Sequence, residues 1–533
     1  MTLLEPATAD AAHSPPSGVL SSRFCLDLRS LAAFRMAVGL ILVADALLRC
    51  RDFSMMFTPE GMFPHTALRA FHPAMGNWSL AFLIDAGWWD ALILGLEAAA
   101  GLALALGFQT RLTSLIAWVA VVSVIRRTAP ATNAGDFWLA TLLLWGCFLP
   151  LGARWSLDSM RRKDRRESPH VSIASVALTL QILVVYLTAG LAKWNATWLS
   201  GHAVRDALSI HDHGTSLGAW LGGLPGVAEV AGPAVLALEL GGPALFLLFP
   251  RPTWIRTAVV GGFMLFHASV ALMMTVGLFS SIGLAAWLAL TPAGVWDWLG
   301  SRLPASRDSS TFVGTPVSKV GGIETAARVG QPPHGGQCHK GVRMLGSMLA
   351  TCLLLVAIAD AVTKLLPTLV EPPQPIRTAV DLACLPQDWE MFGTVLRQEQ
   401  WAYARGVLKN GREVDLLRGG QPLERERPAG GFTSLPNHRW HKLLWNLPKP
   451  TMRVFSPSVA AALANHWNAD HPDDQQVRRV EICFARLSAT TGPGVTEPGV
   501  FHELVVASWP PRDARGSGNL DRWLDEHEPA DTQ

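Results

Sequence analysis

The sequence predicts an α-helical polytopic membrane bundle of about nine transmembrane helices, followed by a C-terminal extramembrane β-rich domain. Three observations predict this fold class. Hydrophobic residues make up 50% of the 533 residues and charged residues only 16%, whereas charged residues make up about 25% of soluble domains. The hydrophobic residues come in blocks of about 20, the length of helix that crosses the hydrocarbon core. The blocks also lack the period-two alternation of barrel strands.

Nine blocks reach this length, and inside lipid only helices or closed barrels satisfy their own backbone. They lie at roughly 30–49, 85–107, 111–128, 136–152, 171–195, 226–249, 257–277, 279–298 and 342–366. A large globular protein with buried helices is the alternative. Such a protein would not need so many uninterrupted apolar runs, so the membrane interpretation is preferred.

Composition divides the rest of the chain. Residues 1–26 are polar, contain two adjacent prolines and lack the apolar core of a signal peptide, so a disordered cytoplasmic tail is expected. The first eight spans form an expected transmembrane domain over 27–300. Residues 301–341 are rich in Gly, Ser and Pro and predict a flexible cytoplasmic linker. The ninth transmembrane helix is expected at 342–366.

Residues 367–533 alternate as strands do and predict the β-rich domain. The stretch "AYARGVLKNGREVDLLRGG" holds two strand-like runs joined by Asn410-Gly411, a type I′ hairpin signal. "RRVEICFARL" and "FHELVVASW" are two further expected strands, and "PSVAAALANHWNA" is an expected helix with Pro457 in its first turn.

Lysine and arginine predict the orientation. The loop "RWSLDSMRRKDRRESPH" carries six of them and is expected in the cytoplasm. Alternation from this loop places the N-terminus inside and residues 367–533 outside, as in a multi-pass inner-membrane protein surrounded by the lipid bilayer. Outside, Cys384 and Cys483 could form a disulfide or remain two thiols. The net charge of +2 gives no indication of nucleic-acid binding, and no protein partner is indicated.

Ionisable side chains inside the spans are costly and are treated as functional hypotheses. They are Arg35, Asp45, Glu97, Asp136, Glu239 and His267. Glu97 and Glu239 are the expected counter-ions of Arg35, although a structural network that fixes helix packing is an equal alternative. His267 could ligate haem, relay a proton or bond a neighbouring carbonyl, and the carbonyl is preferred.

Lys193, in "AGLAKWNATWLSG", stands where the fifth span ends. At 1.5 Å per residue it lies about 33 Å beyond Val171, the thickness of the hydrocarbon core. Position alone therefore favours an interfacial anchor, and a catalytic base is the alternative. The following loop contains His202, His211 and His213 without a recognised metal-ligand spacing. A solvated loop is preferred there, and no metal is predicted.

Several motifs, in order, resemble the HTTM family. They are "FRMAVGLILVADALLR", "FTPEGMFP", "FLPLGARWSLD", "AGLAKWNATWLSG", "FHASVAL" and "DWEMFG". The family comprises membrane proteins related to the vitamin K-dependent gamma-glutamyl carboxylase. The resemblance covers most of the chain, apart from the N-terminal tail and the linker. It implies a helical membrane domain with an outward β-rich region.

The resemblance also implies chemistry at an outer-face pocket. A carboxylase-like lyase or oxidoreductase would use a reduced, vitamin K-like quinone or another lipophilic molecule, with Lys193 as the base. Asn133 matches the first residue of the carboxylase's Asn-His pair, but Ala134 replaces the histidine, so glutamate carboxylation is not expected. The candidate site residues are Lys193 for catalysis and Asn133, His267, Glu239 and Arg35 for cofactor binding. The alternative is a non-catalytic membrane binding or export-assisting protein in which Lys193 is an anchor.

Overall fold

The structure is a computed structural model that describes residues 19–72, 77–161, 169–209, 213–302, 336–366, 371–393, 398–428, 434–488 and 500–511. Most of the predicted tail (1–18), part of the basic loop (162–168), His211 and most of the predicted linker (303–335) lie outside these residues.

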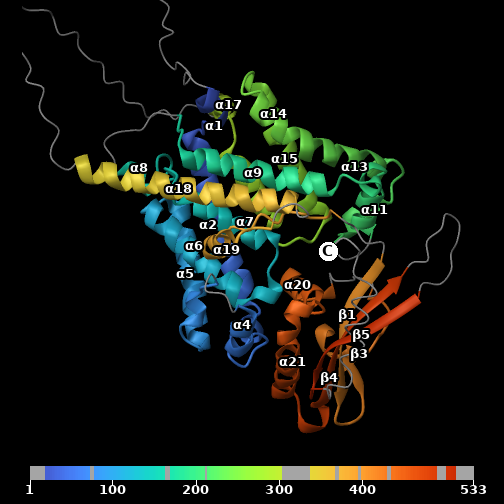
Figure 1. Ribbon diagram of the computed structural model, residues 1–533. Coiled ribbons are helices and arrows are strands. Elements are labelled where there is room, and N and C mark those ends of the chain that lie inside the picture. The colour runs from blue at the N-terminus through green and yellow to red at the C-terminus, as the bar shows by residue number, and fades with distance from the viewer. Residues whose placement is uncertain are drawn as a thin grey trace, which may run out of the picture.

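Helices dominate the described chain up to residue 393 (Figure 1). Their bounds are α1 (Val19–Phe24), α2 (Leu28–Cys50), α3 (Phe53–Met56), α4 (His65–Phe71), η1 (Leu80–Phe82), α5 (Gly87–Leu106), α6 (Thr110–Arg127), η2 (Ala129–Ala131), α7 (Ala134–Gly146), α8 (Leu157–Met160), α9 (Ile173–Ala192), α10 (Ala196–Leu199), α11 (His202–Ser209), α12 (Ser216–Gly222), α13 (Val227–Leu236), η3 (Ala237–Gly241), α14 (Gly242–Leu248), α15 (Thr253–Met273), α16 (Phe279–Ala289), α17 (Ala293–Arg302), α18 (Gly336–Leu365) and α19 (Gln374–Ala383).

Six helical stretches among the described residues are long and apolar enough to cross a membrane. A seventh results if α16 and α17, which meet at 93°, count as one broken span. The predicted count of about nine is not confirmed. The shortfall has a local reason, because α7 has only 13 residues and α6, with 18, begins and ends among polar residues.

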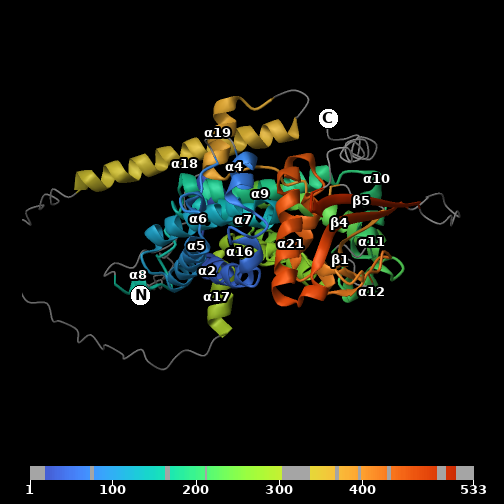
Figure 2. The same cartoon turned by 90° about the horizontal axis from the view of Figure 1, so that it is seen from below.

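Close contacts hold the helices together. The backbones of α2 and α5 cross so closely that a Cβ on Gly39 would lie 2.5 Å from the carbonyl oxygen of Gly101. Only glycine permits this approach. The long helix α18 runs beside α9, which places it along one side of the helical part (Figure 2). Its Asp360 accepts a hydrogen bond from the backbone N–H of Gln387 at 2.8 Å.

The C-terminal region forms the expected antiparallel sheet, in the order β3-β2-β1-β4-β5. Its elements are β1 (Gln398–Leu408), β2 (Glu413–Asp415), η4 (Leu416–Arg418), β3 (Gln421–Pro422), α20 (His438–Asn446), η6 (Pro450–Phe455), α21 (Ser456–Asp470), η7 (Asp473–Gln475), β4 (Val477–Ser488) and β5 (Val500–Trp509). The two later strands and the helix beginning near Pro457 are therefore confirmed.

The first hairpin differs in its turn. The N–H of Gly411 bonds the carbonyl of Leu408 at 3.0 Å, so Lys409 and Asn410 are the central residues. Gly411 has φ +87°, whereas Asn410 does not have a positive φ. A type I′ turn needs positive φ at both central residues, so that prediction is wrong. The hairpin uses a longer loop with glycine in the left-handed position.

The sheet region and the helical part share one apolar core. Phe63 of the segment between α3 and α4 packs edge-on against Phe455, with 5.8 Å between ring centroids. Val459 and Leu463 of α21 belong to the same buried cluster as Met62. Helix α21 lies between the sheet and the helical part (Figure 1). The C-terminal region is consequently fixed against the helices by burial of side chains from both.

Cys384 and Cys483 are both buried free thiols. Cys384 ends α19, and Cys483 lies within β4. Burial raises the pKa of the Cys384 thiol to about 11 and that of the Cys483 thiol to about 12. The thiol alternative therefore describes these two residues, and neither is suited to labelling from solution.

Candidate functional site

Lys193 ends α9 as its C-cap residue and points into the protein. Its Nζ lies 3.0 Å and 2.9 Å from the two carboxylate oxygens of Glu239. The side chains of Lys193 and Glu239 are only 4% and 3% exposed. Nζ also lies 5.4 Å from the ring centre of Trp198, which is buried. Lys193 therefore does not extend to a surface as an interfacial anchor would.

Glu239 reaches Lys193 from η3, a π-helical turn between α13 and α14. Pro243 follows in the first turn of α14. A proline has no N–H and its ring collides with the carbonyl four residues earlier, here that of Glu239, which explains a widened turn at this place. Such π-turns are often found at functional sites. Glu239 is thus the partner of Lys193.

A cavity of about 400 Å³ opens beside this ion pair. Its lining is mostly apolar and comes mainly from α11, α13 and α15, with further residues from α9, α10, α12, η3, α16 and the segment before β1. The lining residues include Lys193, Glu239, Tyr186, His267, Val235 and Phe392. A largely apolar cavity with few, convergent polar groups is the usual form of a small-molecule site.

Tyr186, His267 and Trp287 form a hydrogen-bonded chain at the cavity. Trp287 Nε1 donates to the Tyr186 hydroxyl at 2.8 Å, and that hydroxyl lies 2.6 Å from His267 Nε2. The Tyr186 hydroxyl accepts from Trp287, and the tautomer of His267 sets which partner donates in the second bond. His267 therefore bonds a phenol rather than the expected carbonyl. Its Nδ1 is buried and has no hydrogen-bond partner among the described residues.

Two of the predicted cofactor-binding residues lie elsewhere. Arg35 donates to the carbonyl oxygens of Leu104 at 3.2 Å and Trp155 at 2.5 Å. Its expected pairing with Glu97 or Glu239 is wrong. Asn133 caps α7, where its Oδ1 accepts from the N–H of Gly135 at 2.7 Å. Neither lines the cavity beside Lys193.

Asp136 belongs to a buried network that joins the helices to α20. Arg49 Nη2 lies 2.8 Å from Asp136 and Arg49 Nε lies 2.8 Å from Asp45. Arg439 of α20 contacts the same two carboxylates, at 2.5 Å from Asp45 and 3.1 Å from Asp136. Asp45, Arg49 and Arg439 also interact electrostatically with the buried Glu97. The expected structural network thus exists, but around Arg49 and Arg439.

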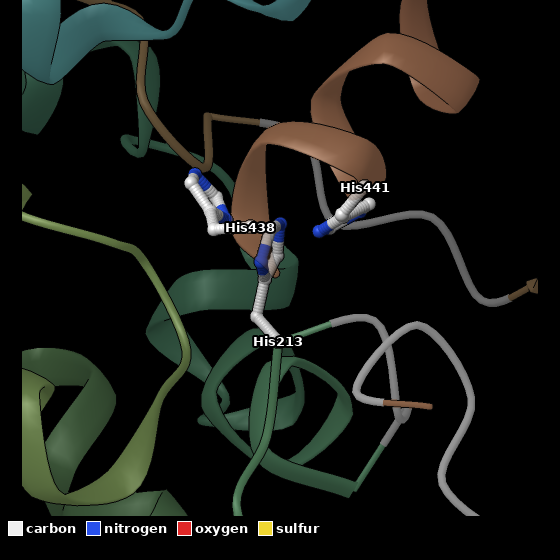
Figure 3. Close-up of side chains that lie close together, drawn as sticks. All are labelled: His213, His438 and His441. Atoms are coloured by element: carbon white, nitrogen blue, oxygen red, sulfur yellow. The ribbon is translucent and has the colours of Figure 1, made fainter. Parts of the chain in front are cut away.

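A cluster that sequence reasoning missed lies near the cavity wall. His213, His438 and His441 each offer a ring nitrogen, and these nitrogens lie within 4.8 Å of one another (Figure 3). Burial lowers the pKa of His213 to about 4 and that of His438 to about 3, and the nearby Lys442 adds to both shifts. The same causes, with His213, hold the pKa of His441 well below its ordinary value. All three rings are therefore neutral at pH 7.

The missed signal was the pair His438-x-x-His441, because residues three apart share one face of a helix. The preceding Asn437 is a helix cap, so the start of α20 was readable as well. Its third member, His213, is 225 positions before His438. Local spacing cannot reveal a pairing over that distance.

The fold and cavity define a protein with several helices long and apolar enough to cross a membrane and a small antiparallel sheet at its C-terminus. Its apolar cavity contains a lysine–glutamate ion pair. The model of the HTTM domain family matches residues 25–294, just over half of the chain. The chain belongs to the HTTM domain family, as its motifs indicated. No curated protein and no solved structure matches it.

Proposed function

We propose that this protein binds a lipid-soluble molecule with a weakly acidic hydroxyl, such as a reduced quinone, in the cavity beside Lys193 and Glu239. The observation that carries the proposal is the buried Lys193–Glu239 ion pair in the wall of an otherwise apolar cavity. Removing two charges from water is costly. Apolar residues in place of the pair would make the interior at least as stable. The presence of the pair is therefore better explained by a role in binding than by stability.

The cavity suits a flat or chain-like apolar molecule with one polar end. Its apolar wall includes Leu221, Val235, Leu265 and Phe266. The unpartnered Nδ1 of His267 supplies a further polar group at the same cavity. A quinol presents hydroxyl groups that both Glu239 and His267 can bond, while its ring and tail contact the apolar wall.

The ion pair acts as the base in this proposal. When a ligand hydroxyl releases its proton to the pair, Lys193 remains an ammonium, Glu239 becomes a neutral carboxylic acid, and the ligand becomes an oxyanion. The oxyanion then lies beside the Lys193 ammonium, which stabilises it. Equivalently, the proton first moves from Lys193 to Glu239 and the resulting neutral amine accepts the ligand's proton. The total charge is unchanged in either route.

Orientation is a further part of the proposal. Arg439 of α20 contacts Asp45 near the end of α2 and Asp136 at the start of α7. The basic loop with Arg154 and Arg161 follows α7 and precedes α9, so it joins the end of α7 that is far from Asp136 to the end of α9 that is far from Lys193. The predominance of basic residues in the cytoplasm would then place the cavity at the outer face of the inner membrane and the C-terminal sheet outside. Nine crossings result if α6, α7 and the bent pair α16–α17 also cross.

The test uses the purified full chain in nanodiscs with reduced menaquinone-4 as the probe. Binding is followed by quenching of tryptophan fluorescence, to which Trp198 in the cavity wall contributes. We expect Lys193→Met and Glu239→Gln to weaken binding at least tenfold. Lys364→Met is the matched control, because Lys364 is exposed near the end of another apolar helix.

A second pair of variants tests the cavity itself. Val235→Trp fills it, whereas Val230→Trp places the same side chain at a 70% exposed position of the same helix. Loss of binding in Val235→Trp alone supports the cavity. Equal binding in all variants, or in none including the wild type, contradicts it. Binding without any pH-dependent ionisation of the quinol would indicate the non-catalytic binding protein instead.

A further inference from the structure

Three histidines from distant parts of the chain converge at one point. His213 lies in the segment before α12, and His438 and His441 lie in the first turns of α20. Their ring centroids are 4.6 Å apart for His213 and His441, 5.7 Å for His438 and His441, and 6.1 Å for His213 and His438. Figure 3 shows the three rings directed toward one another from the two segments.

The backbone fixes His213 in this position. Its carbonyl oxygen accepts two hydrogen bonds from Thr275, from the N–H at 2.6 Å and from the hydroxyl at 3.1 Å. Gly277 follows, with φ +61°, and a Cβ at that position would lie 2.9 Å from a ring carbon of His438. Any larger residue at Gly277 would push against the cluster.

Helix α20 is fixed from the other side. Asn437 Nδ2 and Trp440 Nε1 donate to the two carboxylate oxygens of Asp52, at 2.6 Å and 2.8 Å. Arg439 is held by Asp45 and Asp136. Helix α20, which carries His438 and His441, is therefore bound to the helical part through its neighbouring side chains. These contacts fix the distance between α20 and the segment that carries His213.

The donor set is that of a transition-metal site. Nδ1 of His213 and Nδ1 of His438 are buried and have no hydrogen-bond partner among the described residues. Buried polar atoms without partners are rare, and each one calls for an explanation such as an ion. Imidazole nitrogens suit Zn²⁺, Cu²⁺, Ni²⁺ and Fe²⁺, whereas Mg²⁺ and Ca²⁺ prefer oxygen ligands.

We propose that His213, His438 and His441 bind one divalent transition-metal ion, for which zinc is the natural probe. Tetrahedral zinc bonds imidazole nitrogen at about 2.0–2.1 Å, so bound nitrogens would be roughly 3.4 Å apart. The present nitrogens, within 4.8 Å of one another, reach that separation by rotation of the rings. Three histidines leave the fourth position for water or another ligand.

The positive charge of Lys442 opposes binding of a metal cation, so replacing Lys442 should change the affinity in a known direction. Its charge acts on all three rings, and a cation beside the site raises the cost of adding a dication. The affinity should therefore be moderate in the wild type. Replacing Lys442 by glutamine keeps all three ligands and removes the opposing charge, so that variant should bind zinc more tightly.

The bound ion would connect α20 to the cavity described above. The ring of His213 packs against Phe392 with 5.6 Å between centroids, and Phe392 lines the cavity. A metal at the cluster would hold His213, and with it this part of the wall, against the C-terminal region. This metal site does not depend on the ligand proposed for the cavity, because it can be measured without any quinone.

The experiment measures zinc directly. The purified full chain, treated with EDTA and dialysed, is titrated with zinc chloride by calorimetry, and bound metal is counted by elemental analysis. We expect one zinc per chain. Cobalt in place of zinc should give the intense visible absorption of a tetrahedral site. His213→Gln and His441→Gln should each weaken zinc binding at least tenfold, whereas the exposed His202→Gln should leave it unchanged.

Folding is controlled by the thermal melt of each metal-free variant. Zinc should raise the midpoint of the wild type and of His202→Gln but not of the ligand variants. Stoichiometric zinc with tighter binding in Lys442→Gln supports the site even if a ligand variant fails to fold. No stoichiometric zinc in the wild type, or undiminished binding by well-folded ligand variants, would overturn it.

Discussion

Arg439 of α20 contacts Asp45 inside α2, 394 positions earlier in the chain, with 2.5 Å between Nη2 and Oδ1. The same guanidinium reaches Asp136 at the start of α7, and Arg49 completes a network of two arginines and two aspartates. The C-terminal region thus neutralises carboxylates that belong to the helical part. The buried charges of Asp45 and Asp136, which have no partner within their own predicted spans that could balance both, are balanced in part by Arg439 from outside the spans.

Arg439→Leu should lower the free energy of unfolding by about 3–5 kcal/mol, because it leaves two buried carboxylates with one arginine between them and so one uncompensated charge. The measurement is a thermal or denaturant melt in detergent. Arg412→Leu, at an exposed position of the hairpin between β1 and β2, should change stability by less than about 0.5 kcal/mol. Equal losses for both variants would show that the network contributes no special stability.

Lys193→Met should also destabilise the protein, since Glu239 would be left charged in a dry site. A loss of about 3–5 kcal/mol is expected, and the double variant Lys193→Met/Glu239→Leu should recover much of it. The surface pair Arg205–Glu229, whose side chains are 42% and 46% exposed, is the control. Breaking it by Arg205→Met should change stability far less than breaking the buried pair, because solvent screens exposed charges. Additive losses at the buried pair would disprove its coupling.

Topology can be tested with thiols that the structure shows to be accessible. Cys50, at the end of α2, is exposed, and Met160, at the end of α8, is 81% exposed. In otherwise cysteine-free protein on spheroplasts, an impermeant maleimide should label Cys50. It should label Met160→Cys only after permeabilisation. The opposite pattern would invert the proposed orientation.

The protein is not expected to carboxylate glutamate. Ala134 stands in the first turn of α7 where the carboxylase has histidine, and methyl groups donate no hydrogen bond. Loss of one donor to a reacting anion typically costs about 10²–10³ in rate. The assay supplies reduced vitamin K, labelled carbon dioxide and glutamate-rich peptides. Label in peptide well above the Lys193→Met background would prove the expectation wrong, whereas epoxidation of the quinone alone would support a diverged enzyme.

Acid should destabilise the protein partly through His72, which follows α4. Burial, together with Arg126, lowers the pKa of His72 to about 4, below the ordinary value of about 6.5. Between about pH 4 and 6.5, His72 is therefore protonated in the unfolded chain and neutral in the folded chain. The free energy of unfolding consequently falls as the pH drops from about 6.5 to 4. His72→Gln should flatten this part of a pH–stability curve. His202→Gln should not, and an unchanged slope in both would contradict the assignment.

Local patterns predicted much of the fold. The strand of "RRVEICFARL" is β4, and "FHELVVASW" lies within β5, because alternation and β-branched residues act over a few neighbours. The span count was predicted less well. The apolar block at 136–152 predicted a full-length span, but its helix α7 has 13 residues, most of them buried. At the site, the end of α9 at Lys193 was predicted correctly. Position alone favoured an anchor and the family resemblance a base, but neither indicated Glu239, which lies 46 positions away, as the partner of Lys193.

The π-helical turn at Ala237–Gly241 fits one more residue into its turn than an α-helix would. A chain one residue shorter here would complete an ordinary α-helix, and each residue before the deletion would rotate by about 100° relative to those after it. Glu239 would then face away from Lys193. The ion pair therefore depends on the number of residues in this turn as well as on Lys193 and Glu239 themselves.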